Sequence, residues 1–110
     1  MTSGFQHQSL AEGRWFSFSL AEQLGNIGSE VNRAIRARGD VKRFDGAVTR
    51  ALELFDLTLS DPRWRKRLKE IARSREVFCD ATYGGLEYNT TLEDLNNYFL
   101  YFALAARANR

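Results

Sequence analysis

Apolar residues recur along most of the chain at intervals of three and four, with few intervals of two. This spacing gathers them on one side of an α-helix, whose period is 3.6 residues, and it does not match the alternation of a half-buried strand. One proline, Pro62, interrupts the pattern. The sequence therefore predicts an all-α chain.

Two helices are predicted in the first half. The first should begin near Ser17 or Ser19, either of which can cap it, and should end before Gly39. The second should run from about 41 to 60, with a clear apolar stripe. Inside the first helix, Gly25 and Gly28 each cost about 1 kcal/mol relative to Ala. We interpret them as packing devices at a close helix crossing or at a kink.

Two more helices are predicted in the second half. Asp61-Pro62 is a helix start, because Asp can cap the helix and Pro has no amide hydrogen to leave unsatisfied. The third helix should run over about 62–83. Thr90 and Glu93 match a capping box for a fourth helix over about 91–108. Short connections between four helices of similar length favour an up-and-down antiparallel four-helix bundle.

One domain is expected, because 110 residues are enough to bury a core without metals or disulfides. We assign residues 1–15 to a flexible N-terminal tail and residues 16–110 to a single helical-bundle domain. The one histidine, His7, falls in that tail, which leaves the folded part without a histidine for catalysis. The one cysteine, Cys79, should be an inert thiol in the core.

The stretch RWRKRLKEIARSR, residues 63–75, is strongly basic although the formal net charge of the chain is only +2. On a helix, Lys66, Lys69 and Arg73 lie opposite the apolar stripe that contains Ile71. A solvated polar face is the plainest interpretation. Because Glu70 is the one acid within the stretch, a nucleic-acid interface and an acidic protein partner are two further ones. The candidate nucleic-acid-binding residues are Arg63, Arg65, Lys66, Arg67, Lys69 and Arg73.

Arg75 falls within the apolar stripe of the same predicted helix. An unpaired charge there would cost several kcal/mol, so we expect a buried ion pair that fixes helix register. The candidate partners are Glu30, Glu53, Glu76 and Asp80.

The fourth predicted helix contains YFLYFALAA, residues 98–106, which is apolar on every side. Such a helix must be covered on more than one side, and exposed apolar area usually marks an interface. Leu54, Leu57 and Val77 also lie off their predicted stripes. We expect self-association through Leu100, Tyr101 and Leu104; the alternative is that one large core absorbs these residues.

Composition excludes several functional classes. One cysteine cannot form an intramolecular disulfide and suits a reducing cytoplasm, where we expect the protein. No apolar run approaches the roughly 20 residues of a membrane span, so no membrane association is expected. The paired Glu-x-x-His motifs of di-iron bundles are missing, and the carboxylates Glu53 and Asp56 lack the paired-glutamate motif of helical nucleotide pyrophosphohydrolases. We expect no metal and no cofactor.

Three segments carry a resemblance: WFSFSLAEQLGNIGSEVNRAI (15–35), RALELFDLTLSDPRWRKRLKEIARSREVFCD (50–80) and LNNYFLYFALAARANR (95–110). Together they resemble a set of small prokaryotic helical proteins without an assigned activity. In architecture alone, a basic four-helix bundle that assembles into rings is similar to retroelement accessory proteins and to proteins encoded in ribosomal RNA intervening sequences. That similarity implies nucleic-acid binding beside an enzyme such as a reverse transcriptase. No motif is shared, so no residue is assigned from it.

The sequence thus predicts a non-catalytic, homo-oligomeric accessory protein that contacts RNA or DNA through its basic third helix. Its partners would include a second copy and a nucleic-acid enzyme or another protein. The alternative is a protein–protein adaptor or scaffold whose apolar fourth helix docks a partner. An enzyme acting on a nucleotide is the third hypothesis.

Overall fold

The computed structural model describes residues 13–108, and within that range the chain is helical without a strand. The elements are η2 (Trp15–Ser17), α1 (Leu20–Arg36), α2 (Val41–Leu59), η3 (Pro62–Arg67), α3 (Leu68–Thr82) and α4 (Leu92–Ala108), where η marks a 3-10 helix. The predicted all-α class is confirmed.

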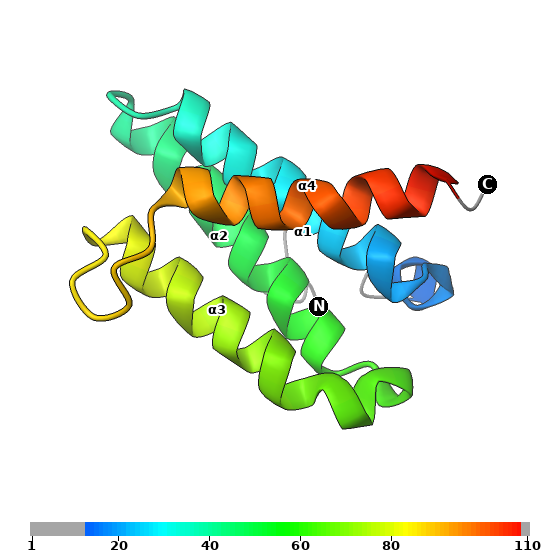
Figure 1. The fold of residues 1–110 in the computed structure, drawn as a ribbon. Helices are drawn as coiled ribbons and strands as arrows, with labels where there is room; N and C mark the ends of the chain where they lie inside the picture. Colours follow the sequence, from blue (N-terminus) through cyan, green and yellow to red (C-terminus); the bar gives the residue numbers. More distant parts are fainter. Residues whose placement is uncertain (1–12, 109–110) are drawn as a thin grey trace, which may run out of the picture.

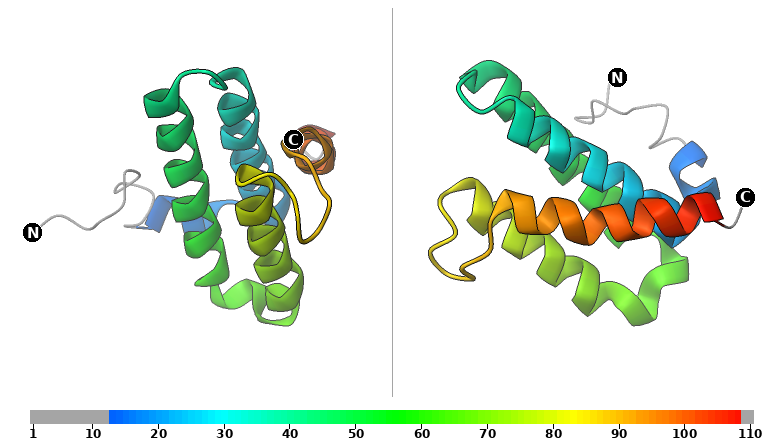
Figure 2. Two further views of the ribbon diagram at one scale, coloured as in Figure 1. Left: turned by 90° about the vertical axis from the view of Figure 1, so that its left-hand side faces the viewer. Right: turned by 45° about the horizontal axis from the view of Figure 1, so that its top comes forward.

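The four α-helices run in alternating directions, as predicted for an up-and-down bundle (Figure 1). α1 and α2 form an antiparallel hairpin, α3 returns beside α2, and α4 packs mainly against α1. In the left view of Figure 2, α4 is seen end-on while the other three helices are seen lengthwise. The fourth helix therefore crosses the other three at an angle, and one long side of it is left uncovered.

The first two helices begin and end where the sequence predicts. The Ser19 hydroxyl accepts a hydrogen bond from the Glu22 amide at 3.1 Å, and the Ser19 amide donates to the Glu22 carboxylate at 2.9 Å, which completes a capping box. Gly39 follows α1 with φ +95°, a conformation that side chains other than glycine rarely adopt. Asp40 caps α2 by accepting from the Arg43 amide at 3.2 Å.

The third predicted helix is not continuous from Pro62. Asp61 caps its start as expected, but residues 62–67 form the 3-10 helix η3, and Trp64 has non-helical dihedral angles (φ −101°, ψ 23°). The Trp64 indole N–H donates to the Gln23 side-chain oxygen at 2.7 Å, which ties the segment to α1. The α-helix begins only at Leu68.

The predicted cap of the fourth helix is wrong by one residue. Thr91 and Asp94 form the reciprocal pair, each donating its backbone amide to the other's side-chain oxygen at 3.1 Å. The Thr90 hydroxyl instead donates to the Tyr88 carbonyl at 3.2 Å, and Glu93 forms an ion pair with Arg38 of the α1–α2 connection. Both residues of the predicted box are therefore engaged elsewhere.

The core extends further toward the N-terminus than expected. Trp15, which we assigned to the flexible tail, is fully buried and donates its indole N–H to Thr58 Oγ1 at 3.2 Å. The predicted tail boundary is therefore wrong at this residue. His7 and the rest of residues 1–12 lie outside the described range.

Leu54 and Leu57 are also buried, so they do not belong to an exposed apolar surplus. α2 packs against α1 on one side and α3 on another, and this arrangement covers more than one stripe of α2. Val77 of α3 is half-buried against the same core. For these three residues the alternative to self-association is therefore correct: they are absorbed by one large core.

Gly25 and Gly28 mark the crossing of α1 and α4. A Cβ atom built on Gly25 would lie 3.0 Å from the Cα of Ala103, and one built on Gly28 would lie 2.5 Å from the Cβ of Phe99. Such distances leave no room for a methyl group. The interpretation of both glycines as packing devices at a close crossing is confirmed.

Candidate nucleic-acid interface

The predicted basic residues of the third helix divide between η3 and the first turns of α3, and they differ in what they contact. Arg65, Lys66, Lys69 and Arg73 are exposed, and Ile71 on the opposite side of α3 is buried. Within residues 13–108, no carboxylate pairs with any of these four side chains. Arg73 lies over the ring of Tyr88, with its guanidinium carbon 5.3 Å from the ring centroid. A free basic surface therefore exists, but it is smaller than predicted.

Arg63 belongs to a structural network. Its Nη2 lies 2.7 Å from Asp61 Oδ2 and also donates to the Phe18 carbonyl at 2.7 Å. Asp61 is buried and also accepts from Gln23 Nε2 at 3.1 Å. The hydrogen bond from Arg63 holds the pKa of Asp61 below its usual value, against the opposing effect of burial. Arg63 thus fixes η3 to the core instead of facing a ligand.

Arg67, the last residue of η3, is neutralised by Glu70 in the first turn of α3. Its guanidinium donates to both oxygens of Glu70, at 2.9 and 3.1 Å. The same hydrogen bonds lower the pKa of Glu70. The four cations Arg65, Lys66, Lys69 and Arg73 are therefore the part of the predicted interface that remains available, and we call them the α3 basic face.

Arg75 does not form the buried pair that was predicted. Its Nε lies 2.9 Å from Asp56 Oδ1, and the two side chains are 34% and 48% exposed. None of the four predicted partners is its ion-pair partner. Because α3 lies beside α2, the arginine reaches the exposed flank of α2 instead of the interior.

The predicted oligomer residues are exposed on α4. Leu100, Tyr101 and Leu104 have 49%, 73% and 52% of their surface accessible, whereas Leu95 and Phe99 face the core. Spacings of three and four place Asn97, Leu100 and Leu104 in one row on the side away from α1. We call Leu100, Tyr101 and Leu104 the α4 apolar face.

A second basic cluster was missed by the sequence reasoning. It lines a hollow of about 650 Å³ between the C-terminal half of α1 and the N-terminal half of α2. Five of its seven lining residues are cationic, and none is acidic: Arg33, Arg36, Lys42, Arg43 and Arg50. We call this hollow the α1–α2 groove. Four of them, Arg33, Arg36, Lys42 and Arg43, lie within residues 33–43, a basic segment that the sequence analysis did not single out.

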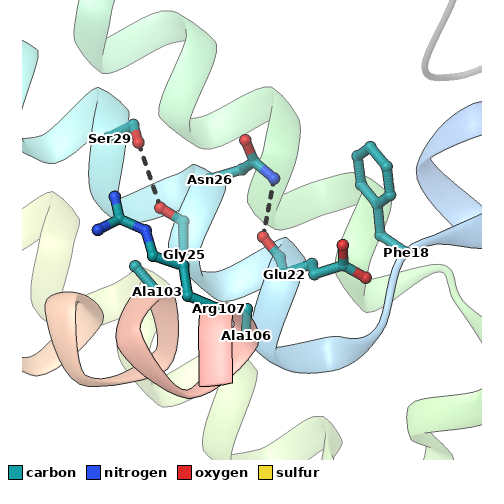
Figure 3. A pocket seen from close by; sticks show the side chains of 8 residues that line it. All are labelled: Phe18, Glu22, Gly25, Asn26, Ser29, Ala103, Ala106 and Arg107. Atoms are coloured by element: carbon teal, nitrogen blue, oxygen red, sulfur yellow. Dashed lines mark hydrogen bonds between the residues drawn. The ribbon is translucent and has the colours of Figure 1, made fainter. Parts of the chain in front are cut away.

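Another hollow, of about 290 Å³, lies where α4 crosses α1 (Figure 3). Two of its polar side chains are turned back on their own helix: Asn26 donates to the Glu22 carbonyl at 2.8 Å and Ser29 to the Gly25 carbonyl at 3.4 Å. The remaining wall includes Phe18, Ala103 and Ala106 and the charged residues Glu22 and Arg107. The Glu22 carboxylate accepts a hydrogen bond from the Ser19 amide at 2.9 Å, so it serves the cap of α1.

Among residues 13–108, no three His, Cys, Asp or Glu side chains are grouped closely enough to hold a metal ion. None of the helices in that range has the length and apolar character needed to cross a membrane.

Cys79 is half-buried, and its Sγ lies 4.0 Å from Arg75 Nη1. The thiol is therefore less enclosed than the core position that was predicted for it.

Comparison of the chain with protein-family models, with curated proteins and with solved structures gave no match.

Proposed function

We propose that the protein is a non-catalytic, cytoplasmic accessory protein that binds RNA or DNA through the α3 basic face. The observation that carries this proposal is the contrast within one short segment. Arg63 and Arg67 have carboxylate partners, whereas Arg65, Lys66, Lys69 and Arg73 have none among the described residues. Exposed cations without carboxylate partners on two consecutive helical segments are suited to phosphate contacts, which position a protein on nucleic acid without reading its sequence.

Self-association belongs to the same proposal. The α4 apolar face leaves three large side chains in water, and a two-fold pairing of identical faces is the commonest way in which such surfaces are covered.

The test of the proposed site is the triple variant Lys66→Glu, Lys69→Glu, Arg73→Glu. Lys69 and Arg73 lie opposite the buried side of α3 and Lys66 is exposed on η3, so both segments should fold as before while nucleic-acid affinity falls at least a hundredfold. Circular dichroism and the melting temperature verify the fold. Wild-type affinity in a folded triple variant would place the interface elsewhere.

The alternative function is a protein–protein adaptor. The exposure of the α4 apolar face favours it, because a different protein could cover the same residues. A protein that is monomeric by mass, binds no nucleic acid at low salt and forms a complex lost on Leu104→Glu would match this alternative.

A further inference from the structure

We infer that the α1–α2 groove is a second phosphate-binding surface, which holds a nucleic-acid backbone. This inference rests on the proposed function, since both assume a polyanionic ligand. It places ligand contacts on α1 and α2, to which the sequence analysis assigned no function.

The first observation is the state of the cations. Of the five that line the groove, Arg33 is paired with Glu30 at 3.1 Å. Within residues 13–108, the side chains of Arg36, Lys42, Arg43 and Arg50 have no ion-pair partner. Four uncompensated cations around one concave surface repel one another and attract phosphate more strongly than the same charges on a convex face.

The second observation is the position of Lys42 and Arg43. They lie in the first turn of α2, whose amide groups create a partial positive charge and whose Arg43 amide already donates to the N-cap carboxylate of Asp40 at 3.2 Å. That turn contains no acidic residue. Cations there oppose the helix dipole, so helix stability does not account for them. An anion beside the same turn would be favoured by the dipole and by both side chains.

The third observation is Gly46, in the wall of the groove. A glycine inside a helix costs about 1 kcal/mol relative to alanine. Unlike Gly28, it makes no close helix contact, because a Cβ built there would be 3.8 Å from the nearest atom, the Nη1 of Arg50. Packing therefore does not require glycine at this position. Its absent side chain keeps the groove open to a ligand backbone.

A neighbouring hollow points to a chain-like ligand. It has a volume of about 180 Å³ and is lined by Ser29, Asn32, Arg33 and Arg36. Arg33 and Arg36 line both hollows, so successive phosphates could lie in the groove and pass over α1 to the Asn32 amide group. A single phosphate would occupy only part of this surface.

The experiment uses the full chain, a fluorescently labelled 20-nucleotide single strand, the corresponding duplex, and inorganic triphosphate as a competitor. The groove variant is Arg36→Gln, Arg43→Gln, Arg50→Gln. The comparison variant removes the same amount of charge from the α3 basic face and carries Lys66→Gln, Lys69→Gln and Arg73→Gln. We expect the groove variant to bind the oligonucleotides at least tenfold more weakly. The slope of log affinity against log salt should fall by up to about 3.

A second variant, Gly46→Leu, fills the groove without changing charge. It should weaken binding several-fold while leaving the melting temperature unchanged or higher. Unaltered affinity in both groove variants would overturn the inference. If only the variant of the α3 basic face loses binding, the proposed function stands and the groove does not contribute to binding. If only the groove variants lose binding, the groove stands and the α3 basic face fails. If inorganic triphosphate competes as strongly as unlabelled oligonucleotide at equal phosphate concentration, the inference of a chain-like ligand is overturned.

Discussion

The Cα of Gly28 is so close to Phe99 that a Cβ built on the glycine would lie 2.5 Å from the Cβ of the phenylalanine. Phe99 is fully buried and its ring packs edge-on against Phe55, with 5.9 Å between ring centroids. This single approach brings α4 onto α1 and links α4 to the aromatic core of α2. The crossing leaves the α4 apolar face in water and thereby defines the surface that we propose for self-association.

Gly28→Ala should therefore destabilise the protein although alanine is the better helix former. The backbone must shift to admit the methyl group, and overpacking of this kind costs about 1–3 kcal/mol. Gly46→Ala is the matched control, because the added methyl meets no close atom and should stabilise α2 by up to about 1 kcal/mol. Urea unfolding of both variants measures the two effects; a Gly28→Ala protein as stable as Gly46→Ala would contradict the close crossing.

The Asp61 network predicts a specific dependence of stability on pH. The pKa of Asp61 is lowered in the folded state, chiefly by the hydrogen bond from Arg63. Its stabilising effect is therefore complete above the ordinary carboxyl pKa and is lost as the pH falls through the lowered one. Asp61→Asn should cost about 2 kcal/mol at pH 7 and much less near pH 3.

Urea titrations of wild type and Asp61→Asn at several pH values check this difference. The control is Asp45→Asn, an exposed carboxylate in α2 that forms no ion pair within the described residues. A gap between wild type and Asp61→Asn that stays constant from pH 7 to pH 3 would be incompatible with an ionised Asp61 in the network.

The Arg75–Asp56 pair is predicted to contribute little. Both side chains are partly exposed, and ion pairs in such positions are typically worth less than about 1 kcal/mol. Arg75→Gln should change the free energy of unfolding by no more than that, whereas breaking a buried pair costs about 3–5 kcal/mol. A decrease of about 3–5 kcal/mol in the free energy of unfolding would instead support the buried ion pair that the sequence pattern predicted.

The α4 apolar face predicts a shift in molecular mass. Leu104→Glu should convert the oligomer to a folded protomer, since the charge enters the apolar contact between copies but faces water in the single chain. Leu86→Glu provides the control, because Leu86 is exposed in the α3–α4 connection, away from that face. Sedimentation at equal concentrations separates the outcomes: a wild type that is monomeric, or a Leu104→Glu variant of unchanged mass, would rule out this interface.

Periodicity and capping residues were enough to predict the helices, because those signals are local. Ser19 and Asp61 cap the elements that the sequence assigns to them, whereas the Asp40 cap of α2 was not predicted. The kink at Trp64 could not be predicted, since it depends on a hydrogen bond to Gln23, 41 residues away.

The partners of the basic residues were equally hidden from the sequence. Arg63 and Arg67 looked equivalent to Lys66 and Lys69 in a charge count, yet the first two are paired and the last two are free of carboxylate partners in the described range. The α1–α2 groove forms where two helices place the cations of the basic segment 33–43 beside Arg50, and the charge of that segment alone does not reveal a hollow.

Binding of wild-type protein to single-stranded and duplex RNA and DNA, measured at about 50 and about 200 mM salt, tests the central claim most directly. If the four cations of the α3 basic face contact phosphates, affinity should fall roughly a hundredfold over this interval, and more if the α1–α2 groove contributes. Absence of binding at the lower salt, or an affinity that salt does not change, would contradict a nucleic-acid-binding function.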